Sequence, residues 1–461
     1  MMSARKQGRG TPGRVWRLLM SVCLLSAGCG QEELAVPQSV GPAVSGSSGP
    51  EIRVHLFSDT DVVIGATTSW NVWERPQGRL LFSYPASPKV GRAHPTQKGA
   101  EAAPYARGSG RSPQSGWKRF RRHQGWIIED ARASAAGKRN VVASTGRHLK
   151  ITVDAGSGEP GLEVKIGDEV KTYRGHLELI AGDDGRIAVI NVLDLEHYLA
   201  GVIGGEMPAS WDEQALQAQA IACRTYALYE KYRRSRNSTE WDIYSTQRSQ
   251  VYRGVQWEHR RTWQAAQQTR GVVLACGSEG REKIFPAFFH SICGGHTAGA
   301  VTGFGIDIAP LSGRPCPYCR LARGPYCNWP TVSVSKNEVS RRLMQRYPVL
   351  QRLDAIVDVA VERSSPHGRV ERLRLTGSNG AEAEILSEDF RLAVSRSEAP
   401  LRSSWYRLAD GGTTWRFEDG RGWGHGVGLC QYGARGLARE GKSGIDILNY
   451  YYPGAILVRA Y

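Results

Sequence analysis

The stretch from residue 193 to 211 constrains this chain most, because it sets one carboxylate among apolar and small residues. It reads LDLEHYLAGVIGGEMPASW, and the carboxylate is Glu206. The two glycines before Glu206 permit a tight turn and the close approach of another group. Pro208 ends regular hydrogen bonding just after the carboxylate. Ser210 and Glu213 have the spacing of a capping box, which predicts that an Ala-rich helix begins here.

The apolar setting of Glu206 has a chemical consequence. Apolar surroundings disfavour the charged form of a carboxyl group and raise its pKa. A glutamate that stays protonated near neutral pH can act as a general acid. The alternative is a surface or capping glutamate with no chemical role.

Three blocks of the sequence resemble the stage II sporulation protein D family, whose members are bacterial cell-wall enzymes that act on peptidoglycan glycan strands. The blocks are LDLEHYLAGVIGGEMPASWDEQALQAQAIACRTYAL at 193–228, YSTQRSQVYRG at 244–254 and GRGWGHGVGLCQYGA at 420–434. The resemblance spans roughly residues 170–461. It implies that Glu206, the glutamate before Met-Pro, is the catalytic acid, and that Tyr252 in the second block contacts substrate.

The third block is a glycine-rich loop that carries one indole and one imidazole. It lacks the lysine and serine of a phosphate-binding loop, so we exclude that function. Trp423 could stack on a sugar face, while His425 and Gln431 could hydrogen-bond sugar hydroxyls. The alternative is a tight structural loop with a buried histidine and tryptophan. The resemblance favours a substrate-binding role for all three.

Arg224 lies on the predicted Ala-rich helix, on the same face as Gln217. A buried arginine is costly unless it is paired. Two interpretations stay open: Arg224 binds a substrate group or holds the Glu206 segment, or it forms a structural salt bridge.

Four residues have the spacing of zinc ligands, in a C-x-x-H pair followed by a C-x-x-C pair: Cys293, His296, Cys316 and Cys319. Four protein ligands leave no open position for water, so the expected zinc is structural. His290 and Cys327 are reserve ligands. The alternative is a set of disulfides, which an exported protein can form. No His-Glu-x-x-His motif supports a zinc hydrolase.

The N-terminus predicts export. Basic residues precede the short apolar run LLMSVCLL and the small residues before Cys29. This is typical of a secretory signal that is too short for a membrane span. The segment before Cys29 resembles a lipoprotein processing site, which would give a membrane-anchored lipoprotein in the cell envelope or periplasm. Simple cleavage and release is the alternative.

The expected fold is α+β, a β-rich domain with a few packed helices. Apolar–polar alternation predicts strands at 52–57, 149–153, 162–166, 177–180 and 187–190. Four parts are expected: a signal or lipoprotein-processing segment at 1–29, a tether at 30–50, a small β segment with a basic low-complexity insertion at 51–140, and a catalytic domain at 141–461.

The insertion at 86–140 contains the densest basic run, KRFRRH at 118–123, and is expected to be solvated and partly disordered. The formal net charge of +16 favours an anionic partner. For an exported protein we expect wall polymer or lipid headgroups and no nucleic acid.

The resemblance implies a lytic transglycosylase that cleaves between N-acetylmuramic acid and N-acetylglucosamine. By the same resemblance, the enzyme is expected to prefer glycan stripped of stem peptides and to leave 1,6-anhydro ends, with Glu206 acting first as acid and then as base. The alternative is a non-catalytic glycan-binding amidase enhancer, with cell-wall amidases as partners.

Overall fold

The structure of the protein is a computed structural model that describes residues 16–17, 34–35, 49–84, 117–122, 126–130, 140–142, 146–154, 161–237, 239–321, 327–396 and 400–461. Apart from Trp16 and Arg17, the expected signal with its Cys29 lies outside these residues, and so does nearly all of the tether. Helices and strands are mixed along the chain, which confirms the α+β class.

The chain divides into two compact units. Unit 1 comprises residues 1–35, 212–222 and 274–457, and unit 2 comprises residues 36–211, 223–273 and 458–461. The boundary expected at 140/141 is corrected by this division. β3 (Glu51–Asp59) pairs along its whole length with β14 (Ile187–Asp194), so the segments on both sides of residue 140 form one sheet. Pairing between strands so far apart in sequence is not visible in a local pattern.

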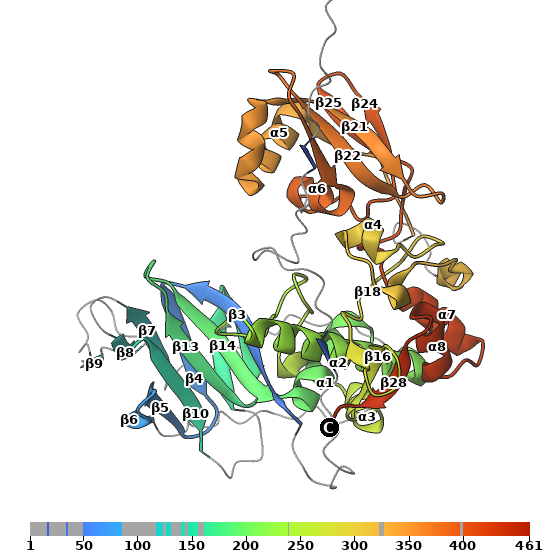
Figure 1. Ribbon diagram of the computed structural model, residues 1–461. Coiled ribbons are helices and arrows are strands. Elements are labelled where there is room, and N and C mark those ends of the chain that lie inside the picture. The colour runs from blue at the N-terminus through green and yellow to red at the C-terminus, as the bar shows by residue number, and fades with distance from the viewer. Residues whose placement is uncertain are drawn as a thin grey trace, which may run out of the picture. The chain divides into compact units, whose positions relative to one another are not determined.

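Two antiparallel sheets, one of them with a parallel edge strand, build unit 2 (Figure 1). Their strand orders are β15-β3-β14-β13-β10-β5-β6 and β12-β11-β4-β7-β8-β9. The remaining strands are β4 (Asp61–Ala66), β5 (Trp70–Arg75), β6 (Arg79–Tyr84), β7 (Lys118–Arg122), β8 (Trp126–Asp130), β9 (Asn140–Val142), β10 (His148–Val153), β11 (Leu162–Ile166), β12 (Glu169–Tyr173), β13 (His176–Ala181) and β15 (Ile243–Tyr244).

The basic run at 118–122 is a strand, which corrects the expectation of a solvated insertion at that point. Phe120 of β7 and Trp126 of β8 are fully buried, and Trp117 is nearly so. The arginines on the other face of β7 are balanced by Asp61, which accepts from the Arg121 guanidinium. Residues 85–116 lie outside the described residues.

Helices of unit 2 follow directly from the first sheet. β14 leads without a loop into α1 (Leu195–Glu206), whose N-cap Asp194 accepts from the backbone N–H groups of Glu196 and His197. α1 packs on α3 (Arg260–Gln268) (Figure 1). The short helix η2 (Val255–Trp257) also contacts α1. α2 (Glu213–Ser235), whose residues are divided between the two units, confirms the predicted helix but begins two residues later than an N-cap at Ser210 would place it.

Unit 1 contains a hydrophobic core formed by residues between 329 and 417. α5 (Lys336–Arg346) and α6 (Ser387–Val394) pack against the sheet β1-β23-β22-β21, and α5 also packs against β20 of the sheet β20-β25-β24 (Figure 1). The strands are β1 (Trp16–Arg17), β20 (Val332–Ser335), β21 (Ile356–Ser364), β22 (Val370–Gly377), β23 (Glu382–Leu386), β24 (Arg407–Asp410) and β25 (Thr414–Glu418), with η6 (Pro348–Leu353) between α5 and β21.

The rest of unit 1 consists of short strands and helices, and two residues each of β16 and β28 are assigned to unit 2. A further sheet has the order β2-β17-β16-β28, and two pairs are β18-β27 and β19-β26. The elements are β2 (Leu34–Ala35), β16 (Val272–Cys276), β17 (Lys283–Ile284), β18 (Phe289–His290), α4 (Ala300–Phe304), η3 (Ala309–Leu311), η4 (Pro317–Leu321), β19 (Asn328–Trp329), β26 (Gly420–Arg421), β27 (Leu429–Cys430), α7 (Gln431–Arg439), α8 (Gly444–Tyr451) and β28 (Ile456–Arg459).

Among the residues that the structure describes, none of the helices combines the length and the apolar character needed to cross a bilayer.

Candidate functional site

Glu206 is the last residue of α1 and is partly buried. Its Oε1 accepts a hydrogen bond of 2.8 Å from the backbone N–H of Val251. The chain leaves the helix at Met207, which is extended and donates back to the Ile203 carbonyl. The second block of the sequence therefore holds the carboxylate that the first block supplies, and Glu206 and Val251 both belong to unit 2.

The glycines before Glu206 are required by the protein's own chain. A Cβ on Gly205 would lie 2.5 Å from the carbonyl oxygen of Val251, and a Cβ on Gly204 would overlap the carbonyl of Trp257. The close approach expected from these glycines is thus the approach of segment 251–257 to the end of α1. This packing fixes where the carboxylate of Glu206 sits.

Gly205→Ala is expected to destabilise the protein by about 1–3 kcal/mol, the usual cost of forcing extra atoms into a packed site. At an unhindered helix position, replacing glycine by alanine would stabilise the protein by about 1 kcal/mol. A net loss of stability in Gly205→Ala would therefore be caused by the steric clash with Val251. Urea unfolding measures the change. His197→Ala, on the exposed face of the same helix, is the control and should stay near wild type. A Gly205→Ala protein at least as stable as wild type would contradict the close contact.

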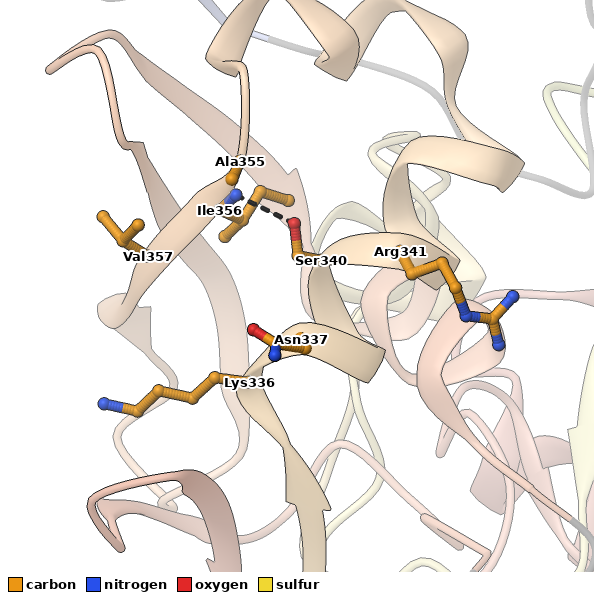
Figure 2. Close-up of a pocket in the computed structure, with 7 residues that line it drawn as sticks. All are labelled: Lys336, Asn337, Ser340, Arg341, Ala355, Ile356 and Val357. Atoms are coloured by element: carbon orange, nitrogen blue, oxygen red, sulfur yellow. Dashed lines mark hydrogen bonds between the residues drawn. The ribbon is translucent and has the colours of Figure 1, made fainter.

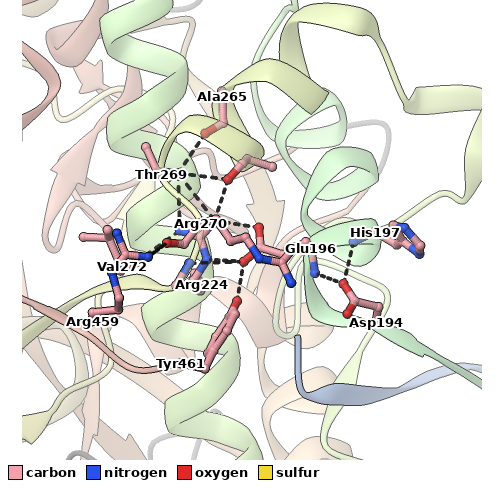
Figure 3. Close-up of polar contacts among 12 residues, drawn as sticks. Asp194, Glu196, His197, Arg224, Ala265, Thr269, Arg270, Val272, Arg459 and Tyr461 are labelled. Atoms are coloured by element: carbon pink, nitrogen blue, oxygen red, sulfur yellow. Dashed lines mark hydrogen bonds and ion pairs between the residues drawn. The ribbon is translucent and has the colours of Figure 1, made fainter. Parts of the chain in front are cut away.

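Arg224 is fully buried and sits at the centre of a polar cluster (Figure 3). Its guanidinium donates to both carboxylate oxygens of Glu196, at 2.8 Å each. It also donates to Thr269 Oγ1 and to the carbonyls of Ala266 and Val272. These partners leave no exposed face for a ligand. Of the two interpretations that the sequence left open for Arg224, this geometry matches the structural salt bridge.

Glu196 is the partner that sequence reasoning missed, since a glutamate and an arginine 28 positions apart carry no spacing signal. The Tyr461 hydroxyl and the Gly271 N–H also donate to Glu196 (Figure 3 shows Tyr461). Burial alone would raise the pKa of Glu196, but Arg224 with these two donors holds the pKa below its ordinary value of 4.5. The pair thus anchors α1, at whose other end Glu206 lies.

This ion pair predicts acid sensitivity of folding. A carboxyl whose pKa is lowered in the folded state contributes stability that is present above pH 4.5 and is lost as the pH falls through its folded value. Urea unfolding from pH ~7 to pH ~3 should show stability declining below about pH 4.5. In Glu196→Gln the decline over this window should be smaller. An unchanged slope in that variant would contradict the assignment.

Tyr252, predicted to contact substrate, is also buried, and its contacts in the structure are with the protein itself. It is 3% exposed, its hydroxyl donates to Asn191 Oδ1, and its ring packs on Tyr198 at a centroid distance of 5.0 Å. A Cβ on Gly201 would touch the same ring. Tyr252 therefore fastens the second block to α1 and to β14.

Trp423 and His425 lie in unit 1, in the loop between β26 and β27. Every second residue of this loop is a glycine with positive φ, from Gly422 to Gly428. The loop lies on segment 288–293: Trp423 exchanges backbone hydrogen bonds with Ile292, and β27 pairs with β18. The glycines serve this intramolecular packing. Trp423 is partly buried, and the Arg402 guanidinium lies 4.5 Å from its ring centroid.

The ring nitrogens of His425 are engaged by the backbone. Nδ1 accepts from the Val427 N–H, so we assign the proton of the neutral ring to Nε2, and the ring also hydrogen-bonds the Phe289 backbone. Burial lowers the pKa of His425 to about 4, so the imidazole is neutral at neutral pH. Gln431, the first residue of α7, is 4% exposed. The geometry of both residues matches the structural-loop alternative better than contact with sugar hydroxyls.

Three of the four predicted zinc ligands lie together. The Sγ atoms of Cys293, Cys316 and Cys319 form a buried group with a fourth sulfur, that of Cys430, all within 4.8 Å of one another. We call these four residues the sulfur cluster. The fourth predicted ligand, His296, lies outside this cluster, and its Nδ1 bonds the Thr297 carbonyl.

The ring of His296 stacks on His367 at a centroid distance of 3.5 Å, which accounts for its absence from the sulfur cluster. The reserve ligands His290 and Cys327 also lie outside the cluster. Cys430 could have been suspected from its place in the third sequence block.

A shallow pocket of about 400 Å³ lies between α5 and β21 (Figure 2). Its lining includes Lys336, Ser340 and Ile356, and the Ser340 hydroxyl is already bonded to the Ile356 N–H. None of the residues singled out from the sequence lines this pocket, and we assign no function to it.

Comparison with known proteins identifies the class to which this fold and site belong. The family model of the stage II sporulation protein matches residues 183–275, a range that includes Glu206, Arg224 and Tyr252. An uncharacterized protein of Brachyspira hyodysenteriae is 32% identical over 286 residues, which cover 62% of this chain and 72% of that protein. Stage II sporulation protein D of Bacillus subtilis is 28% identical over 284 residues, covering 58% of this chain and 75% of the relative.

The amidase enhancer of Bacillus subtilis is 25% identical over 300 residues, covering 56% of this chain but only 40% of the relative. The chain belongs to the stage II sporulation protein D family.

Proposed function

We propose that this protein is a lytic transglycosylase that cleaves peptidoglycan glycan strands, with Glu206 as the reacting carboxyl. The observation that carries the proposal is the position of Glu206. It lies within the range matched by the family model, and the Val251 N–H holds its side chain at the end of a buried, ion-pair-anchored helix. A carboxyl fixed in this way is oriented for proton transfer to a bound sugar.

The reaction needs one carboxyl in two consecutive roles. Glu206 first gives its proton to the oxygen of the bond between N-acetylmuramic acid and N-acetylglucosamine, and that bond breaks at C1 of the muramic residue. The muramic 6-hydroxyl then closes on C1 and returns a proton to the carboxylate. The products are a 1,6-anhydro end and a new free 4-hydroxyl, with no net use of water. Most glycosidases use two carboxyl groups instead.

The experiment is incubation of the purified protein with glycan strands stripped of stem peptides, followed by mass spectrometry of the soluble products. The proposal predicts fragments with 1,6-anhydro ends. Strands that still carry stem peptides serve as the second substrate, because the family resemblance implies that they are cleaved more slowly. Strands that remain intact in both reactions would count against the proposal.

A second candidate rests on the relative named amidase enhancer, which aligns with 56% of this chain. In that case the protein binds glycan and stimulates a cell-wall amidase without cutting the strand itself. A pull-down on purified wall, run beside an amidase assay, separates the two candidates. Retention on the wall with faster amidase turnover, and no anhydro fragments, would favour the enhancer.

For location we propose export through the signal at 1–29 and anchoring to a membrane of the cell envelope by a lipid on Cys29. The substrate then lies in the same compartment. The formal net charge of +16 supports retention at an anionic wall or lipid surface.

A further inference from the structure

The sulfur cluster joins three segments of unit 1 that are far apart in sequence. Cys293 follows β18, the C-x-x-C pair brackets the start of η4, and Cys430 ends β27 at the N-cap of α7. All four side chains are at most 2% exposed. Four thiols converging in a dry interior need an explanation, since packing alone would be served better by aliphatic side chains.

The sulfur spacing fits metal coordination and not disulfides. The Sγ atoms of Cys293 and Cys319 are 3.6 Å apart. A disulfide requires about 2.05 Å. Tetrahedral zinc with zinc–sulfur bonds of about 2.3 Å places its ligands about 3.8 Å apart. None of the seven cysteines in the described part of the chain forms a disulfide.

The surroundings of the cluster suit thiolates, which only accept hydrogen bonds. The Gly295 N–H donates to Cys293 Sγ at 3.4 Å, and the Cys293 N–H donates to Cys430 Sγ at 3.3 Å. The Tyr451 hydroxyl lies 3.1 Å from Cys316 Sγ, and a thiolate there would accept a hydrogen bond from it. Such outer hydrogen bonds orient the ligands of metal sites.

Two further features favour a metal–thiolate group: one provides space beside a sulfur atom, and the other provides a compensating positive charge. A Cβ on Gly433 would lie 2.7 Å from Cys316 Sγ, so the glycine keeps space open beside that sulfur. Four thiolates around one zinc ion carry a net charge of about −2. Arg369, 3% exposed, donates to the Cys293 carbonyl at 2.8 Å and places a buried cation next to the cluster.

We propose that the sulfur cluster binds one structural zinc ion and that this ion fastens the glycine-rich loop to its unit. Cys430 lies two residues after the loop that carries Trp423 and His425, and Cys293 belongs to the segment on which the loop lies. Cys316 and Cys319 lie at η4, which packs on α7. The site has four protein ligands and no open position, so it holds the loop in place and takes no part in bond breaking. This proposal is independent of the proposed lytic activity.

The test is metal analysis of the full chain purified without a polyhistidine tag. We expect one zinc per chain. Cys430→Ser should lower zinc affinity by more than ~10-fold, because even loss of an outer-shell partner costs about 10–100-fold. Cys327→Ser and His296→Ala are matched controls, and both should keep the metal. Zinc lost from His296→Ala but kept in Cys430→Ser would overturn the ligand set.

A second measurement on the wild type covers the case in which Cys430→Ser fails to fold. X-ray absorption at the zinc edge should give four sulfur neighbours at about 2.3 Å. A shell containing nitrogen would refute the all-sulfur site. Intact-mass analysis without reductant should show free thiols once the metal is removed by acid. Two disulfides and no zinc in freshly purified protein would overturn the proposal entirely.

Discussion

Glu206→Gln is expected to lower the rate of anhydro-product formation by about 10²–10⁴-fold, the usual contribution of a positioned general acid or base. Glutamine keeps the size of the side chain, and its carbonyl oxygen can still accept from the Val251 N–H. What it loses is the proton that the glycosidic oxygen must receive. Product formation on stripped glycan strands, quantified by mass spectrometry, measures the effect.

The control for this variant is Glu213→Gln, an exposed glutamate a few residues further along the chain that bonds Gln217. It should react at the wild-type rate. Urea unfolding of Glu206→Gln should match the wild type, so that lost activity is not lost folding. A folded Glu206→Gln protein that still forms anhydro ends at full rate would rule out Glu206 as the acid.

Arg224→Met is expected to destabilise the protein by about 3–5 kcal/mol, because it leaves the carboxylate of Glu196 buried and without its cation. Few single substitutions cost as much. Arg224→Lys should also be destabilising, since an ammonium cannot reproduce the fork that reaches Glu196, Thr269 and two carbonyls. The urea midpoint and the thermal midpoint measure both losses.

The double variant Glu196→Leu with Arg224→Met provides the matched comparison. Replacing a buried ion pair by apolar side chains of similar volume is often neutral, so most of the lost stability should return. An Arg224→Lys protein that is as stable as wild type but has a raised KM for glycan would contradict the structural role. It would show instead that Arg224 binds substrate.

Local patterns predicted much of the fold. Apolar–polar alternation identified β3, β10, β11, β13 and β14, and the Ala-rich run identified α2, although the helix begins two residues later than its predicted cap at Ser210 implied. The run at 118–122 failed for a physical reason. Its arginines suggested a solvated segment, but β7 buries Phe120 and turns Arg119 and Arg121 toward Asp61. Burial of the Phe120 side chain on the inner face of β7 therefore decides that this segment is a strand, despite the charged side chains on its outer face.

The candidate site was predicted less completely than the fold. Glu206 and the block that holds it were singled out together, because both lie in contiguous motifs. The partner of Arg224 and the fourth sulfur of the cluster were missed, because each is fixed by long-range packing. Glu196 and Cys430 meet their partners across 28 and more than 100 positions of sequence. Hydrophobic periodicity along the sequence does not predict such long-range contacts.

The most direct test of the account is cleavage of stripped glycan strands in heavy-oxygen water. Glu206-assisted closure of the muramic 6-hydroxyl on C1 uses no water, so the new ends should be 1,6-anhydro and carry no heavy oxygen. Reducing ends labelled with heavy oxygen would show hydrolysis, and unchanged strands would show no cleavage; either result would contradict the account.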